Sequence, residues 1–203
     1  MTAFVDQAIT DRALGLALHY PLLHAAVVGL AARRTFEFGA GGSTRVLLDA
    51  IATTGGEHHS ISTAPQEEIA ARYAIRPPAR WAHTHGRSED HRGLDVGLLD
   101  LVLHDGSHSA DVVAGDIAWI WPRLRPFGLL LVHDTQHGYV GPQMREGLRR
   151  GLDAAGARCT CTTLSYGFGL TIVRREEGGP GMVEPAVAKV ISSHQTVLAE
   201  FRP

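Results

Sequence analysis

The sequence predicts an α/β fold: a Rossmann-like doubly wound sheet that is mostly parallel and closes with an antiparallel C-terminal hairpin strand. Three observations predict it. Short apolar segments alternate with amphipathic ones over the first 155 residues, as strands do when crossover helices join them. A turn rich in glycine, at 39–42, separates the first strand from its helix. Further along, two strand-like segments flank residues 166–168, which indicates a hairpin.

The expected elements follow in this order. Residues 5–33 are helical with a break at Pro21, because proline removes a backbone donor from a helix. Strands are expected at 35–38, 59–62, 80–85, 99–104, 129–132, 158–165 and 169–173. Helices are expected at 43–53, 66–73, 111–124 and 143–155, and residues 126–128 are expected to form a turn. The chain divides into an N-terminal helical cap (1–34), a Rossmann-like core (35–175) and a C-terminal linker with a short helix or tail (176–203).

Composition and charge narrow the class of partner. A net charge of −2 and a pI near 6.6 argue against a surface for nucleic acid or anionic membranes. No apolar run reaches the length of a membrane span, and the first residues lack the pattern of a signal peptide. We therefore expect a cytoplasmic protein. The two cysteines, Cys159 and Cys161, cannot form a zinc site alone and are expected to be small buried apolar residues.

The turn at residues 37–44 is the first candidate for a binding site, and it reads EFGAGGST. Glycines let the backbone approach a ligand closely, and the start of the following helix offers unpaired amides. Taken alone, this turn fits either a nucleotide-type cofactor or a tight turn that only packs, because Thr44 interrupts the dinucleotide fingerprint. Glu37 favours a cofactor without pyrophosphate, since a carboxylate at this place would repel phosphates.

Two further motifs follow, LDLVLHDGSH at 99–108 and RPFGLLLVHD at 125–134. With the glycine turn they resemble the class I S-adenosylmethionine (SAM)-dependent methyltransferases, and most of all their small-molecule and sugar O-methyltransferase branch, over roughly residues 30–175. The resemblance implies that SAM is bound by Glu37, Gly39, Gly41, Ser43, Ser62, Ser88 and Asp105. Ser62 stands where the family usually has an acid that holds the ribose hydroxyls, which implies a weaker contact without charge assistance.

Asp105 and Asp134 end two strands that should be near neighbours, so their carboxylates should meet at the same edge of the sheet. Together with His133 they could hold a divalent ion; oxygen ligands favour magnesium, and an imidazole also admits manganese, iron or zinc. The resemblance implies magnesium at the aspartates, although the family usually has an acid in place of His133. It also implies that His108 is the general base for a substrate hydroxyl and that Asp105 takes part in catalysis.

Each of these residues also has a structural interpretation. Asp105 could cap the following helix, His108 could lie on the surface and His133 could be a structural histidine. Asp116 lies inside a predicted helix and is expected to make an ion pair or a solvent contact, and His104 is expected to pack or to bond the backbone.

Three functions are therefore open. The first is metal-assisted O-methylation of a small hydroxylated metabolite or natural-product intermediate. The second is a metal-dependent lyase, hydrolase or isomerase reaction on the same scaffold, and the third is a non-catalytic methyltransferase-like subunit that acts through residues 176–203. The small-molecule substrate would be enclosed by residues 1–33 and the loop 135–143, whereas Phe4, Leu22 and Leu23 could instead form the surface of a homo-oligomer.

Overall fold

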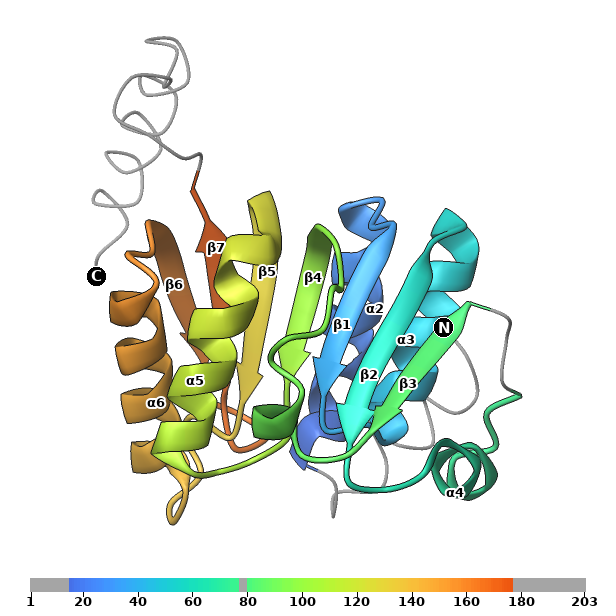
Figure 1. Cartoon of the computed structure of the whole chain (residues 1–203), viewed down its shortest axis with the longest axis horizontal. Helices are drawn as coiled ribbons and strands as arrows, with labels where there is room; N and C mark the ends of the chain where they lie inside the picture. Colours follow the sequence, from blue (N-terminus) through green and yellow to red (C-terminus); the bar gives the residue numbers. More distant parts are fainter. Residues whose placement is uncertain (1–14, 77–79, 177–203) are drawn as a thin grey trace, which may run out of the picture.

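A computed structural model describes residues 15–76 and 80–176 of the chain. Its centre is a seven-stranded sheet with the strand order β3-β2-β1-β4-β5-β7-β6 (Figure 1). The first five strands run parallel, and β7 is antiparallel to both of its neighbours, β5 and β6. The predicted α/β doubly wound fold is confirmed, with the difference that the antiparallel strand lies inside the sheet and β6 forms the edge.

The strands are β1 (Arg34–Phe38), β2 (Glu57–Ser62), β3 (Trp81–His85), β4 (Leu99–His104), β5 (Leu124–His133), β6 (Cys159–Leu164) and β7 (Leu170–Arg175). The helices are α2 (Tyr20–Gly29), α3 (Gly42–Thr54), α4 (Gln66–Arg72), α5 (Ala110–Ile120) and α6 (Gly141–Ala154), with short 3-10 turns η1 (Gly15–His19), η2 (Ser88–Asp90) and η3 (Trp121–Arg123). No helix within the described ranges is long and apolar enough to cross a bilayer.

Helices cover both faces of the sheet, with α5 and α6 on one face and α2 and α3 on the other (Figure 1). Alternation along β1 assigns its side chains to the two layers, since successive residues of a strand point to opposite faces. Phe36 and Phe38 pack in the layer of α5, whereas Glu37 bonds to residues of α3. Because β1, β2, β3, β4 and β5 run parallel, their carboxyl ends meet at one edge of the sheet, and this edge carries the site.

Two segments differ from the expected boundaries. Residues 126–128 are not a turn before the strand but an irregularity within β5, which begins at Leu124. Here the pairing of β4 with β5 shifts register between Leu99 and Leu101, and Phe127 adopts a left-handed φ of 65°. The helix expected over 111–124 ends at Ile120 and continues as η3, because Pro122 has no backbone donor with which to extend α5.

Three expectations about burial also change. Cys161 is exposed and Cys159 is half-buried, because β6 is the edge strand of the sheet and most of its residues are exposed. Leu23 is fully buried in the core beneath α2 and Leu22 is partly buried against it, so Leu23 is no part of an oligomer surface. Phe4, the first part of the cap and the short helix expected within residues 176–203 lie outside the described residues.

Candidate active site

A cavity of about 850 Å³ lies at the carboxyl edge of the sheet. The predicted site residues that line it are Gly39, Gly41, Ser43, Ser62, Ser88, Asp105, His108, His133 and Asp134. They come from the last residues of β2 and β5, from the first turn of α3, and from the segments that directly follow β1, β3, β4 and β5. The topology therefore gathers residues that are nearly 100 positions apart in the chain into one hollow.

The glycine turn is held between the ends of β2 and β4. The Gly39 amide donates to the carbonyl of Ile61 at 2.9 Å, and the Asp105 amide donates to the carbonyl of Phe38 at 2.9 Å. Gly39 has a φ of +87°, and a Cβ atom there would lie 2.2 Å from the carbonyl oxygen of Asp105. Both the conformation and the close approach require glycine at this position.

Glu37 supports this turn from inside the protein. Its carboxylate is fully buried, accepts hydrogen bonds from the hydroxyls of Ser43 and Thr44, and lies 3.4 Å from Nε2 of His58. The Thr44 hydroxyl oxygen in turn accepts from the amide of Gly41 at 2.8 Å. Glu37 is not among the residues that line the cavity, so the structure gives it a role in fixing the turn, and its direct contact with a cofactor stays a prediction.

The far side of the cavity is formed by the ends of β2 and β3. The Ser62 hydroxyl bonds the backbone of Ala64, accepting from its amide at 3.1 Å. Glu89 and Arg87 also line the cavity and form an ion pair at 2.6 Å. A hydrogen bond from its own backbone amide, reinforced by Arg87, holds the pKa of Glu89 below its ordinary value. A carboxylate thus stands on the same wall of the cavity as Ser62, the residue that replaces the usual acid.

Two histidines and two aspartates meet on the opposite side. Nε2 of His108 lies 2.8 Å from Oδ2 of Asp134, and Nδ1 of His133 lies 2.9 Å from Oδ1 of Asp105 and 3.3 Å from Oδ1 of Asp134. Nε2 of His133 donates to the carbonyl of Gly167 at 2.8 Å. Asp134 therefore contacts both imidazoles. His108 is exposed at the mouth of this group, as its structural interpretation expected, but it is also paired with Asp134. The helix cap position of α5 is Ser109 and not Asp105.

The charges in this group stabilise one another. Burial by itself would lower the pKa of His133, but hydrogen bonds to Asp105 and Asp134 raise it to about 10. Burial by itself would raise the pKa of Asp134, but hydrogen bonds from His108 and His133 hold it well below its usual range. The same hydrogen bond to Asp134 raises the pKa of His108. The group therefore has strongly perturbed titration, as catalytic sites often do.

The same group has the ligands for a metal ion. One ligand atom each of Asp105, His133 and Asp134 lies within 4.8 Å of the others. Nε2 of His133 donates to the carbonyl of Gly167, so Nδ1 is the ring atom that faces the carboxylates. A backbone acceptor for the second ring nitrogen is typical of metal-binding histidines. The donor set therefore fits a divalent cation, with Nδ1 carrying either a proton or the ion.

Several residues of the cavity had no signal in the sequence. Tyr20 from α2 and Tyr73 after α4 line it beside the glycine turn, and Phe168 reaches it from the β6–β7 turn. Phe168 has a left-handed φ of 64°, between two glycines with the same sign of φ. A left-handed conformation at a non-glycine residue indicates that the surrounding structure holds the turn in place. The sequence alone does not show this conformation.

The fold has counterparts among known proteins. Residues 36–135 match a family described as a methyltransferase domain. Among solved structures, the SAH-bound methyltransferase PaMTH1 of Podospora anserina is 15% identical, with a TM-score of 0.65, over 87% of this chain and 89% of that one. The SAM complex of TomG, an O-methyltransferase of tomaymycin synthesis from Streptomyces achromogenes, is 21% identical, with a TM-score of 0.62, over 87% and 91%.

A third structure is MycE of the mycinamycin pathway in complex with Mg, SAH and mycinamycin VI, which is 17% identical, with a TM-score of 0.61, over 89% of this chain and 57% of that one. No protein of curated function matches the sequence significantly. At these identities the solved structures establish the fold, and the family match covers the glycine turn together with the ends of β4 and β5. Residues 36–135 of the chain therefore match a methyltransferase domain, on a fold that the chain shares with SAM- and SAH-bound methyltransferases.

Proposed function

We propose that this protein methylates a hydroxyl group of a small metabolite or natural-product intermediate, with SAM bound in the cavity at the carboxyl edge of the sheet and a divalent ion beside the substrate oxygen. The observation that carries the proposal is the pairing of His108 with Asp134 in the same cavity as the glycine turn. A neutral imidazole held by a carboxylate on one nitrogen has the other nitrogen for proton transfer.

The cofactor half of the site is the cleft between the glycine turn and the loop after β3. We assign the aminoacyl end of SAM to Gly39, Gly41 and Ser43, and the adenosyl end to Ser62 and Ser88. Glu37 acts on the residues assigned to the aminoacyl end indirectly, because its carboxylate accepts hydrogen bonds from the hydroxyls of Ser43 and Thr44. When bound, SAM supplies an electrophilic methyl group on a sulfonium.

His108 is the proposed general base. The Asp134 carboxylate can only accept, so Nε2 of His108 carries the hydrogen of their 2.8 Å contact and Nδ1 is the basic atom. Nδ1 would take the proton of the substrate hydroxyl as the hydroxyl oxygen forms its bond to the methyl group. SAM would supply that methyl group and leave as S-adenosylhomocysteine (SAH), with the electrons of the broken C–S bond on sulfur. The reaction is a displacement in line, so the residues around it contribute mainly by orienting the reactants.

Asp105, His133 and Asp134 would hold the divalent ion. Such an ion would lower the pKa of a hydroxyl bound to it and so make proton transfer from that hydroxyl to His108 more favourable. Two carboxylates favour magnesium, and the imidazole of His133 adds manganese, iron and zinc to the candidates. MycE was crystallised with Mg, which supports an ion in a protein of this fold.

The test is an assay of SAH release with SAM and a panel of small phenols, catechols and sugars, in the presence of Mg²⁺ and after EDTA. The proposal predicts release with at least one hydroxylated compound, and a loss of that activity in His108→Ala with SAH binding retained. Transfer to amines or thiols, with none to hydroxyls, would overturn O-methylation. Full activity after EDTA and in Asp105→Asn would remove the ion from the mechanism.

A further inference from the structure

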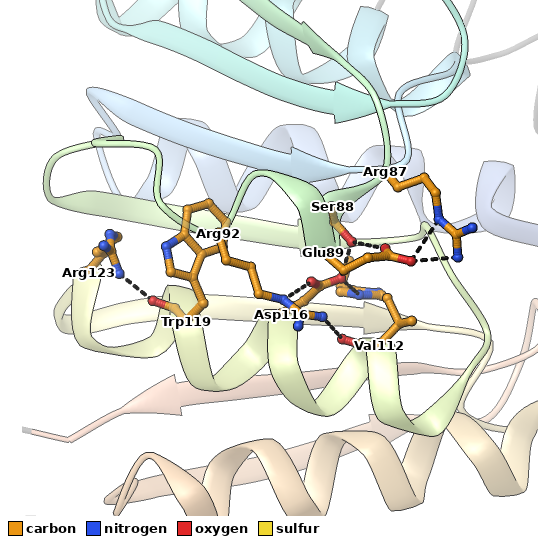
Figure 2. Close-up of polar contacts among 9 residues, drawn as sticks. Arg87, Ser88, Glu89, Arg92, Val112, Asp116, Trp119 and Arg123 are labelled. Carbon is orange, nitrogen blue, oxygen red and sulfur yellow. Dashed lines mark hydrogen bonds and ion pairs between the residues drawn. The ribbon is translucent and has the colours of Figure 1, made fainter.

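Asp116 of α5 is a buried carboxylate that contacts three polar side chains from two other segments, as Figure 2 shows in part. The Ser88 hydroxyl donates to its Oδ2 at 2.6 Å, and Nε of Arg92 donates to its Oδ1 at 3.0 Å. On the other side, Nε2 of His104 lies 3.3 Å from Oδ2. The side chain of Asp116 has no exposed surface, whereas that of Arg92 is partly exposed.

Burying a carboxylate costs free energy unless hydrogen bonds and a charged partner compensate it, and the bonds to Asp116 also restrain the groups that donate them. Two of the partners belong to the segment that follows β3: Ser88 begins the 3-10 turn η2, and Arg92 lies two residues beyond its end. Arg92 crosses α5 and donates a second hydrogen bond to the carbonyl of Val112 at 3.0 Å. A Cβ atom on Gly115 would lie 2.4 Å from the Arg92 guanidinium, so α5 has a glycine where the arginine crosses it.

The segment that Asp116 holds forms one wall of the cavity. Residues 86–89 line it, and the amide of Gly86 donates to the carbonyl of Ser62 at 2.8 Å, which joins this wall to the end of β2. Asp116 itself is not among the lining residues. It can affect a ligand only through the segment that it holds, and that segment carries the carboxylate of Glu89.

We propose that Asp116 is a positioning residue for the cofactor: its carboxylate holds Ser88 and Arg92 so that residues 86–89 stand ready against the adenosyl end of SAM. This inference rests on the proposed location of SAM in the cavity. It explains why an acid lies on the buried face of α5, among Val113, Ile117 and Ile120, where an apolar residue would pack without this cost. The cavity has Ser62 in place of the usual acid. On this inference, the wall beside Ser62 is ordered before the cofactor binds.

The variant Asp116→Asn tests the inference, and Asp111→Asn is its matched control, because Asp111 lies on the same helix in an exposed ion pair with Arg150. SAH binding is measured by calorimetry, and SAM kinetics by SAH release. We expect Asp116→Asn to weaken SAH binding and raise the KM for SAM about tenfold or more, as the loss of a buried charged hydrogen bond does, with kcat at saturating SAM unchanged. Backbone amides of residues 86–92 should exchange hydrogen faster in the variant, and Asp111→Asn should match the wild type in all three measurements.

A second variant covers the case in which Asp116→Asn does not fold. Arg92→Gln breaks the same arrangement from the other end, and Arg92 is not a lining residue, so the same rise in KM with unchanged kcat is expected. If Asp116→Asn folds, or Arg92→Gln is used in its place, and the variant binds SAH as tightly as the wild type, the inference is overturned. The proposed function is then unaffected. A lower kcat with an unchanged KM also overturns it. Absence of SAH binding to the wild type overturns the proposed function, and this inference with it.

Discussion

Nε2 of His108 lies 2.8 Å from Oδ2 of Asp134, a contact that joins the loop after β4 to the end of β5. Asp134 adopts a left-handed φ of 60° directly after β5, a conformation that costs a non-glycine residue about 1–2 kcal/mol. The surrounding contacts hold it there, since its carboxylate also lies 3.3 Å from Nδ1 of His133. Backbone strain at a residue with perturbed titration is typical of functional sites.

The first prediction concerns the base. His108→Ala should retain SAH binding, because the histidine stands at the substrate side, while turnover falls about 100- to 10,000-fold, the usual contribution of a general base. Calorimetry with SAH and the SAH-release assay measure the two effects. His24→Ala is the control, since His24 lies on α2 outside the cavity lining. Turnover of His108→Ala within twofold of wild type would refute the role.

The second prediction concerns the metal ligands. Without an ion, the carboxylates beside His133 raise its pKa to about 10, so Nδ1 is protonated at pH 7 and must lose its proton when an ion binds. Titration of the EDTA-treated protein with Mn²⁺ in buffers of different ionisation enthalpy should show release of about one proton per ion. His133→Asn should release none. Binding of Mn²⁺ to the wild type without proton release would exclude His133 as a ligand.

The third prediction concerns Glu37. Replacing it by Gln leaves one buried oxygen to accept two hydroxyls, from Ser43 and Thr44, so the free energy of unfolding should fall by about 1–3 kcal/mol. SAH affinity should fall as well, because the glycine turn loses its support. Urea unfolding checks the first effect and calorimetry the second. Glu146→Gln, in an exposed pair with Arg149, should change neither, and an equal effect of the two variants would contradict the account.

The fourth prediction concerns pH. Burial lowers the pKa of His59 and of His83 below the ordinary value of 6.5. At a pH between the ordinary pKa and the lowered pKa, the unfolded chain therefore binds more protons than the folded protein. Their contribution to stability is therefore present above pH 6.5 and is lost as the pH falls below it. The double variant with Gln at both positions should lose less stability than wild type over that range. His85→Gln, at an exposed position of β3, is the control, and a slope that the double variant leaves unchanged would contradict the assignment.

Much of the site could be predicted because parallel strands place their carboxyl ends together. The bounds of β4 agree with the expected 99–104, since an apolar run between turn residues marks a buried strand clearly. Asp105, His108, His133 and Asp134 follow such strands, so their meeting needed no knowledge of side-chain positions. The contact of His108 with Asp134 was not predicted, because the sequence specifies the edge of the sheet and not the rotamers on it.

The support around the site was harder to predict. Ser88 and Asp116 are 28 positions apart, and nothing in either segment alone indicates that they bond. One signal was present: Asp116 follows Val113 by three and precedes Ile120 by four, so it lies on the apolar face of α5, where an acid needs a partner. The position of Phe168 depends on the left-handed turn between β6 and β7, which propensity alone does not predict.

The central claim is that the cavity beside Gly39 binds SAM, and calorimetric titration of the wild-type protein with SAM tests it most directly. We expect saturable binding of one SAM per chain. Binding should be lost in Gly39→Ala, whose Cβ would lie 2.2 Å from the carbonyl oxygen of Asp105, and kept in Gly138→Ala, where no atom lies within 4 Å. Folded wild-type protein that gives no heat of binding at millimolar SAM would contradict the account.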